Sequence, residues 1–373
     1  MTSEHARIDT DVFYRESCDA GFVKREAIAR NIAWETPTEW GDLQITINLS
    51  KPEKDPRAIA AAAEEAKAAA GGGAGAKTFV DAATGRVRPC PLCVTEEDVE
   101  CGYARHIELR GEPWGLWYSP YAYYNEHCIA MSWVHRPMHI DRSAFEALAD
   151  FSDLLPHYFI GSNADLPIVG GSILGHDHFQ GGRHVFPMQQ APIDRSFELP
   201  AFPQVKCGIV RWPMSTLRFV SDDRAQLLDA ACAVLDAWRI YDDPAVGIVS
   251  HDADGTRHNT VTPILRRQGG TAQGAYELDL ALRCNVTSAE HPLGVFHPHE
   301  DLHHIKKENI GLIEVMGLAI LPPRVRDTMA DRNLTRDDVG RLFARVLEDA
   351  GVFKWDDAGQ GAFDRFVQFL QKQ

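Results

Sequence analysis

Residues 170–182 read Gly-Gly-Ser-Ile-Leu-Gly-His-Asp-His-Phe-Gln-Gly-Gly, a polar triplet enclosed by glycines. If the segment is extended, side-chain alternation places His176, His178 and Gln180 on one face of a strand. Glycines let phosphate oxygens approach backbone N–H groups closely. A bare His-x-His pair is more often structural than functional. The flanking glycines, the aligned glutamine and a distant cysteine pair together favour a phosphate-handling site.

The composition is that of a globular protein, with 45% hydrophobic and 24% charged residues. The length of 373 residues is enough for about two domains. A formal net charge of −15 disfavours nucleic acid and membrane surfaces as partners, because both attract basic proteins. A small anionic substrate is compatible with a locally positive pocket. We find no run of about 18 apolar residues and no apolar signal core at the N-terminus, so we expect a cytoplasmic protein.

Eight cysteines are present, and Cys90 and Cys93 form the one tight pair among them. In a cytosolic chain this spacing is typical of half a metal site or of a redox motif. A tetrahedral zinc site needs two further ligands. The alternative is a pair of buried thiols without a ligand.

Strands and helices are expected in a mixed order without regular β-α-β alternation, which favours an α+β fold. We divide the chain into two halves, 1–195 and 196–373, each with an antiparallel sheet flanked by helices. Strands are predicted over 41–50, 115–121, 127–134, 167–174, 178–187, 207–212, 245–250, 259–266 and 276–285. Helices are predicted over 57–70, from a capping box of Ser143 and Glu146 to about 156, over 224–239 and as a pair over 334–371.

The His-Asp-His-Phe-Gln string resembles the histidine-triad (HIT) superfamily, whose hydrolases carry a third histidine where this chain has Gln180. His-x-His-x-Gln is the variant of the hexose-1-phosphate uridylyltransferases. The resemblance extends over about residues 40–325, in the stretches 41–56, 90–93, 119–129, 170–188 and 291–322. These stretches are similar to the Gram-positive-type branch of the galactose-1-phosphate (UDP-glucose–hexose-1-phosphate) uridylyltransferase family. Members of that branch usually carry a longer N-terminal segment than this chain. We therefore assign no subunit contacts and no substrate cover to such a segment.

The resemblance implies two HIT-like halves and a ping-pong transfer of UMP from UDP-glucose to galactose 1-phosphate. His178, the central member of the triplet, is the expected nucleophile, because neutral imidazole attacks phosphorus readily. The leaving sugar phosphate is a weak base and needs no proton. A neutral amide at Gln180 therefore suffices to hold the phosphoryl oxygens. A homodimer is compatible with this family, and hexose specificity stays open.

The resemblance also implies a structural zinc. In the family, a histidine at the end of a strand and the first histidine of the triplet complete the cysteine pair. These map onto His135 and His176, with His127 as the competitor for the first of the two. The zinc would tie the cysteine segment to the strand that carries His178.

Further candidates lie in the second half and around the triplet. Four histidines between 297 and 304 indicate either a second metal near His297 and His299 or a hydrogen-bonded loop. Lys306 and Lys307 suit the phosphate of hexose 1-phosphate, or are an exposed pair. Substrate contacts are also expected from Glu314 to sugar hydroxyls, and from Asn163 and Ser172 to the sugar-nucleotide phosphates.

Two other classes of function fit the same residues. A sugar-nucleotide phosphorylase or a nucleotide hydrolase would also use His178, although Gln180 argues against the hydrolase. A non-catalytic UDP-sugar-binding protein would bind its ligand without forming a covalent bond to UMP.

Overall fold

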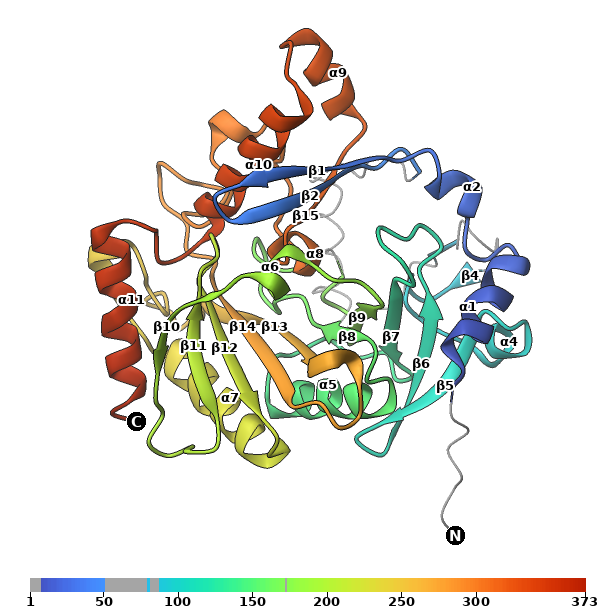
Figure 1. Ribbon diagram of the computed structural model, residues 1–373, viewed down its shortest axis with the longest axis horizontal. Coiled ribbons are helices and arrows are strands. Elements are labelled where there is room, and N and C mark those ends of the chain that lie inside the picture. Colours follow the sequence, from blue (N-terminus) through green and yellow to red (C-terminus); the bar gives the residue numbers. More distant parts are fainter. Residues whose placement is uncertain (1–7, 51–78, 81–86, 172) are drawn as a thin grey trace.

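The computed structural model describes residues 8–50, 79–80, 87–171 and 173–373 (Figure 1). The helix predicted over 57–70 and the candidate Ser172 lie outside these residues. Two short helices begin the described chain, α1 (Thr10–Asp19) and α2 (Arg25–Ile28). A two-stranded ribbon, β3 (Phe79–Val80) with β4 (Val87–Arg88), precedes the cysteine pair, and α4 (Glu96–Glu100) follows it.

An antiparallel sheet of ten strands runs through both halves, in the order β10-β11-β12-β14-β13-β8-β9-β7-β6-β5. The first half contributes β5 (Ala104–Leu109), β6 (Glu112–Tyr118), β7 (Cys128–Ser132), β8 (Phe159–Gly161) and β9 (His178–Gly182). The second half contributes β10 (Ile193–Phe197), β11 (Lys206–Val210), β12 (Thr216–Ser221), β13 (Asn259–Arg267) and β14 (Tyr276–Cys284). The halves join where β8 pairs with β13. The predicted α+β class is confirmed, and the two sets of strands form one sheet.

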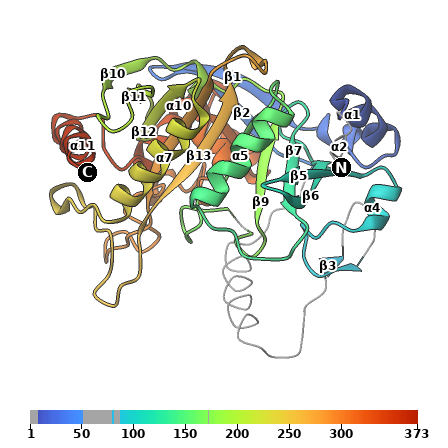
Figure 2. The ribbon, with the colours of Figure 1, turned by 90° about the horizontal axis from the view of Figure 1, so that it is seen from below.

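Three helices cover one face of this sheet: α5 (Arg142–Leu154), α7 (Arg224–Arg239) and α11 (Asp357–Leu370) (Figure 2). Their apolar sides, including Phe145, Trp238 and Phe366, belong to one buried cluster with Leu280 and Phe179 of the sheet. Since side chains alternate along β9, Phe179 faces the helices while His178 and Gln180 face the opposite side. The helix-covered face thus fixes which side of the sheet carries the polar residues.

The opposite face carries a second, smaller layer (Figure 1). A three-stranded sheet is formed by β1 (Ile32–Thr38), β2 (Gly41–Ile47) and β15 (Leu318–Leu321), with β15 parallel to β2. Around it lie α6 (Pro187–Gln190), α8 (Leu312–Val315), α9 (Arg324–Asp331) and α10 (Arg336–Ala350). Strands from the first half therefore pair with a strand from the second. The division at residue 195 falls inside β10 and stays a prediction.

Local predictions fail where the backbone departs from regular geometry. The N-cap of α5 is Asp141, which accepts from the amides of Ser143 and Ala144, so the predicted Ser143–Glu146 box is wrong. The described residues of 167–174 form no strand. A Cβ on Gly170 would lie 2.4 Å from the Ala164 carbonyl oxygen, because this segment folds back on its own chain.

The strand predicted over 245–250 is also wrong, and the one over 178–187 is too long. Pro244 opens a 3₁₀ turn that ends at Gly247 with φ 78°, which breaks an extended run. Strand β9 ends at Gly182, whose φ is 149°. Among the described residues, no helix is both long and apolar enough to cross a membrane.

Candidate active site and metal centre

His178 begins β9, and its side chain is buried. The ring donates from Nδ1 to the backbone carbonyl oxygen of His176 at 2.7 Å. Because this contact requires the proton on Nδ1, Nε2 carries the lone pair. Burial lowers the pKa of His178 to about 4, so the ring is uncharged at neutral pH. An uncharged, oriented imidazole is what attack on phosphorus requires.

Gln180 lies two residues along the same strand and on the same face as His178. Its backbone is opposite Ile129 of β7 and Gly161 of β8. Its Oε1 atom is 3.1 Å from Nε2 of His127. His127, the competitor for the zinc site in the sequence, is thus in contact with Gln180.

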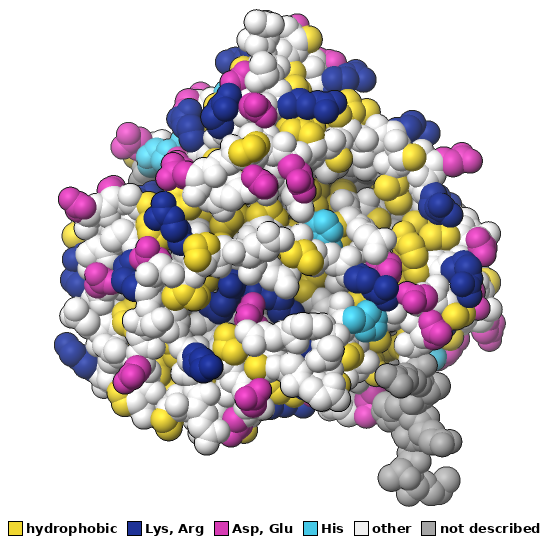
Figure 3. Space-filling view, viewed as in Figure 1, with side chains coloured by type: hydrophobic (Ala, Val, Ile, Leu, Met, Phe, Trp, Pro, Cys, Tyr) yellow, Lys and Arg dark blue, Asp and Glu magenta, His cyan; other side chains and the backbone are white. Residues whose placement is uncertain are grey.

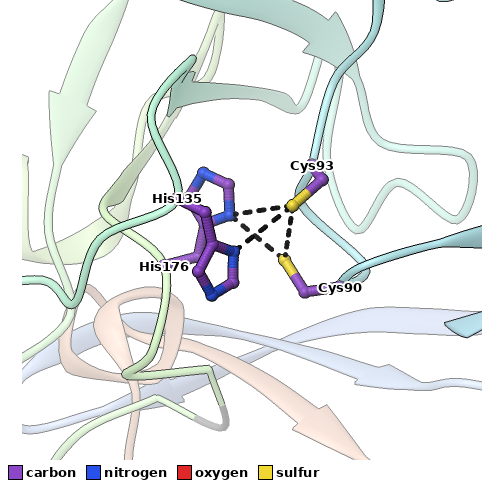
Figure 4. A group of neighbouring side chains, drawn as sticks. All are labelled: Cys90, Cys93, His135 and His176. Carbon is purple, nitrogen blue, oxygen red and sulfur yellow. Dashed lines mark hydrogen bonds between the residues drawn. The ribbon is translucent and has the colours of Figure 1, made fainter. Parts of the chain in front are cut away.

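Four potential metal ligands are brought together at the start of β9 and the end of β7 (Figure 4). Cys90 Sγ lies 3.1 Å from His176 Nδ1 and 3.3 Å from Cys93 Sγ, and Cys93 Sγ lies 3.3 Å from His135 Nδ1. All four ligand atoms lie within 4.8 Å of one another. His135, and not His127, is the histidine that joins His176 in this cluster.

The surroundings of the cluster suit a cation. A tetrahedral zinc with two sulfur and two nitrogen ligands places ligand atoms about 3.3–3.8 Å apart. The His176 ring donates from Nε2 to the Ser132 carbonyl oxygen at 2.8 Å, which leaves the Nδ1 lone pair facing the sulfurs. The Leu92 amide is 3.4 Å from Cys90 Sγ, an interaction that favours a thiolate.

A buried ion pair fastens the cysteine segment. Arg88 pairs with Asp98 through Nη1 at 2.5 Å and Nη2 at 2.6 Å, and also donates to the Cys93 carbonyl oxygen at 2.7 Å. Asp98 accepts from the backbone N–H of Thr95 at the start of α4. These contacts hold the loop that carries Cys90 and Cys93 in one geometry. Nothing in the sequence pattern marked Arg88 for this role.

The metal cluster and the nucleophile are connected through one residue. The His176 ring faces the cysteines, while its backbone carbonyl accepts the proton of His178 Nδ1. His176 itself lies in a bend before β9, so the predicted common face applies to His178 and Gln180 only. The Ser132 carbonyl turns the His176 ring away from that face.

Three of the substrate candidates lie near α8. Lys306 is buried, and its Nζ lies 2.7 Å from Glu314 Oε1. Glu314 Oε2 accepts from the Gly311 amide at 3.2 Å, and Asn163 Oδ1 accepts from the Leu312 amide at 2.9 Å. Lys307 is exposed. The structure therefore brings together Asn163, Lys306 and Glu314, without Lys307.

Tyr123 lies beside His127, the partner of Gln180. Its ring centroid lies 5.5 Å from that of His127, and its hydroxyl hydrogen-bonds Asn48. Burial raises the pKa of Tyr123 to about 12, and the charges of Glu314 and Lys306 both act on it. Tyr123 thus lies beside the contact of His127 with Gln180 and within electrostatic reach of Lys306 and Glu314. Of these residues, His127 was predicted only as a competitor for the zinc site, and Tyr123 and Asn48 were not predicted as site residues. Tyr123 and His127 lie in the stretch 119–129, and Asn48 lies in the strand predicted over 41–50.

The histidine-rich segment does not gather its rings. His297 donates to the Pro298 carbonyl oxygen at 3.2 Å, and His303 donates to the same oxygen at 2.9 Å. His299 contacts the Val295 carbonyl oxygen and Asp349. Across the described part of the chain, the cluster at Cys90 is the one group of three or more potential metal ligands. The second of the two sequence interpretations, a hydrogen-bonded loop, describes this segment.

The glycines around the triplet have different environments. A Cβ on Gly181 would lie 2.6 Å from the Phe159 carbonyl oxygen, and one on Gly171 would lie 2.6 Å from Asn163 Nδ2. Gly175 has open space where its Cβ would be. Close packing against the protein thus explains most of these glycines, and Gly175 is the one open to a ligand.

Acidic and basic side chains are interspersed over the molecular face seen in Figure 3, which bears no broad field of one sign among the residues coloured there. Within the candidate site, the buried cation Lys306 is paired with Glu314.

The fold places the chain among known architectures. Yeast Ap4A phosphorylase Apa2 superposes with a TM-score of 0.50 at 11% identity, over 92% of this chain and 96% of that one. At this level of identity the likeness shows the fold alone. The chain thus shares the α+β fold of that protein, with His176 just before the central strand β9 and His178 at its start.

Sequence comparison narrows this class. The N-terminal domain model of galactose-1-phosphate uridyl transferase matches residues 3–137, and the C-terminal domain model matches residues 152–339. Galactose-1-phosphate uridylyltransferase 2 of Streptococcus pneumoniae is 48% identical over 95% of this chain and 77% of its own length. The corresponding protein of Lactiplantibacillus plantarum is 46% identical over 96% of this chain and 78% of its own. The chain belongs to the galactose-1-phosphate uridylyltransferase family.

Proposed function

We propose that the protein transfers UMP from UDP-glucose to galactose 1-phosphate through a covalent intermediate on His178. The observation that carries this proposal is the buried, uncharged His178 ring, with its Nδ1 proton given to the His176 carbonyl and its Nε2 lone pair available. Relatives named galactose-1-phosphate uridylyltransferase cover 95% of the chain or more in the comparisons above, which supports the choice of substrates.

The first half-reaction is an in-line displacement. His178 Nε2 attacks the α-phosphorus of UDP-glucose, an N–P bond forms, and the bond from that phosphorus to the bridging oxygen breaks. Glucose 1-phosphate leaves with the electron pair, and no proton is needed because a phosphate is a weak base. Galactose 1-phosphate then enters where glucose 1-phosphate left, and its phosphate oxygen reverses the step to give UDP-galactose.

Gln180 and the Lys306 group are proposed to hold the substrates. The Gln180 amide would donate to the phosphoryl oxygens as negative charge moves onto them. Lys306 and Lys307 would bind the phosphate of hexose 1-phosphate, and Glu314 would accept hydrogen bonds from the sugar hydroxyls. Asn163 and Ser172 would contact the phosphates of the sugar nucleotide. The buried position of Lys306 and the contact between Tyr123 and His127 support this arrangement.

We also propose that Cys90, Cys93, His135 and His176 hold a structural zinc. The metal would supply a rigid anchor for the chain before β9, and no step of the transfer passes through it. A cytoplasmic location and a homodimer complete the proposal.

A sugar-nucleotide phosphorylase is the second candidate, because inorganic phosphate could discharge the same His178 intermediate. Incubation with UDP-glucose and inorganic phosphate alone separates the two. Net formation of UDP from UDP-glucose would favour the phosphorylase, whereas the transferase requires a sugar phosphate as acceptor.

The test of the transferase is a search for the intermediate. The intact protein is incubated with UDP-glucose and weighed by mass spectrometry, and exchange of labelled glucose 1-phosphate into UDP-glucose is followed without a second sugar. We expect the mass of one UMP in an acid-labile, base-stable bond, and exchange that His178→Asn abolishes while UDP-glucose binding persists. Label mapped to His176 or His184, or exchange by the Asn variant, would refute the assignment.

A further inference from the structure

The contact between His127 and Gln180 orients the amide that faces the reaction. An amide side chain presents a carbonyl oxygen at one end and an N–H₂ group at the other. An anionic phosphoryl group accepts hydrogen bonds only, so it needs the N–H₂ end. If the amide were reversed, its carbonyl oxygen would face the phosphoryl oxygens and repel them.

His127 selects between these two orientations. Its Nε2 lies 3.1 Å from Gln180 Oε1, and a proton on that nitrogen is donated to the oxygen. With Oε1 engaged in this way, the N–H₂ group is the end that points elsewhere. Since His178 and Gln180 share one face of β9, that end is available to a phosphoryl group on His178.

The His127 ring is held in place from several sides. It is 3% exposed, and the ring centroids of Tyr124 and Tyr123 lie 4.5 Å and 5.5 Å from it. Tyr124 also donates from its hydroxyl to the Gly181 carbonyl oxygen at 3.0 Å, which ties the His127 segment to the strand of Gln180. A ring clamped in this way can fix the orientation of its partner.

The backbone before His127 is strained in a way that serves this position. Glu126 has φ 52°, in the left-handed region that non-glycine residues seldom occupy. Its carboxylate accepts hydrogen bonds from the Tyr158 hydroxyl and, at 3.1 Å, from Asn125 Nδ2, and Arg183 Nε lies 3.4 Å away. These contacts of the buried Glu126 carboxylate thus hold an unfavourable turn that brings the His127 ring to Gln180.

We propose that His127 is a positioning residue for UMP transfer, acting through Gln180 and not as a metal ligand. The inference rests on the proposed function, and it assigns to His127 the task of presenting the Gln180 N–H₂ group to the phosphoryl oxygens. The transfer itself is unchanged: the N–P bond forms at His178 and the sugar phosphate leaves with its electron pair.

The test is a double-mutant cycle measured on metal-replete protein. His127→Phe keeps a ring between the tyrosines but removes the N–H donor, and His127→Gln restores a donor at a similar reach. The rate of UMP attachment to the protein, kcat, KM, metal content and thermal midpoint are measured for each variant alone and with Gln180→Ala. A neighbouring pair of the same kind, His184 with its Nε2 2.7 Å from Gln44 Oε1, supplies the matched control through His184→Phe.

We expect His127→Phe to slow UMP attachment about 10- to 100-fold with little change in KM, and His127→Gln to recover most of the rate. In the Gln180→Ala background, His127→Phe should have less than about a twofold further effect, because its route of action is gone. His184→Phe should combine additively with Gln180→Ala. Should the Phe variant not fold, His127→Asn, which is smaller and too short to reach the amide, is measured in the same cycle.

Two results would overturn the proposal. Additive effects of the His127 and Gln180 substitutions would show that the two side chains act independently. A loss of bound metal in His127→Phe would show that His127 is a ligand. If the wild-type protein itself gains no UMP, the proposed function fails; if it does and His127→Phe keeps the full rate, the positioning role alone fails.

Discussion

Residue by residue, the candidate site depends on single hydrogen bonds that each fix one choice. The His176 carbonyl fixes which nitrogen of His178 carries the proton, and the Ser132 carbonyl does the same for the His176 ring. His127 fixes the direction of the Gln180 amide. Ser132 ends the neighbouring strand β7 and His127 directly precedes it, whereas His176 lies in the bend before β9 itself, so the register of β7 against β9 decides two of these three contacts.

At Gln180, removal of the amide tests whether it stabilises charge. We expect Gln180→Ala to slow both half-reactions by about 2–4 kcal/mol of barrier, the typical loss for one donor to a developing charge. Gln180→His should increase release of UMP to water relative to transfer, because a ring at this position can supply a proton. Stopped-flow measurement of each half-reaction checks the first expectation, and the ratio of UMP to UDP-galactose formed checks the second. A His variant with wild-type transfer and no added hydrolysis would contradict this role.

At the metal cluster, substitution of Cys90 or Cys93 should affect metal content and stability more than substitution of an exposed cysteine. Cys90→Ser or Cys93→Ser should lower the zinc content of the purified protein. Each substitution should also lower the free energy of unfolding by several kcal/mol, because the ligand set loses its ion. Cys101, which is exposed, supplies the control, and Cys101→Ser should change stability by no more than about 0.5 kcal/mol. Elemental analysis and urea unfolding provide the measurements. Metal-free wild-type protein with full activity would refute the zinc site.

Strand β9 and the chain just before it carry the candidate site. Substitution of their glycines distinguishes positions needed for packing from positions open to a ligand. Gly181→Ala would place a Cβ 2.6 Å from the Phe159 carbonyl oxygen, so β9 must shift against β8. We expect a loss of about 1–3 kcal/mol in the free energy of unfolding, as for other overpacked positions, together with lower activity.

Gly175→Ala is the matched substitution, because no atom of the described residues, apart from its two chain neighbours, lies within 4 Å of its added Cβ. Its stability should stay within about 0.5 kcal/mol of wild type. If Gly175 admits a substrate phosphate, the KM for UDP-glucose should rise while the thermal midpoint does not move. An unchanged KM would leave Gly175 without a part in binding.

Regular elements could be predicted from the sequence, and the contacts between them could not. The helix predicted over 224–239 corresponds to α7 with the observed bounds, and the runs at 259–266 and 276–285 correspond to β13 and β14. The run at 167–174 is as apolar as a strand, but its glycines serve close backbone approach. The proximity of Cys90 and His176 was predicted from the family resemblance and not from the sequence pattern alone. The contact of His127 with Gln180 depends on pairing of Ile129 with Gln180, a register that no local pattern encodes.

For the whole molecule, the continuous ten-stranded sheet implies that the two halves unfold together. Residues Ile264 and Leu265 of β13 pair with Gly161 and Ile160 of β8, and α5 and α7 share one buried cluster beneath that junction. We expect one thermal transition, with far-ultraviolet circular dichroism and tryptophan fluorescence giving the same midpoint. Two separated midpoints would show that the halves at residue 195 are independent domains.

The merged sheet also leaves only two outer strands, β5 and β10, where two separate sheets would leave four. Unpaired outer strands invite other chains to add to them and so promote aggregation. Both strands here carry charged side chains, Arg105 and Glu108 on β5 and Asp194 and Arg195 on β10, and β10 has an irregular register between Ile193 and Arg195. Such features discourage strand addition. A homodimer of this protein should therefore form through some other surface, without extending the sheet from one molecule into the next.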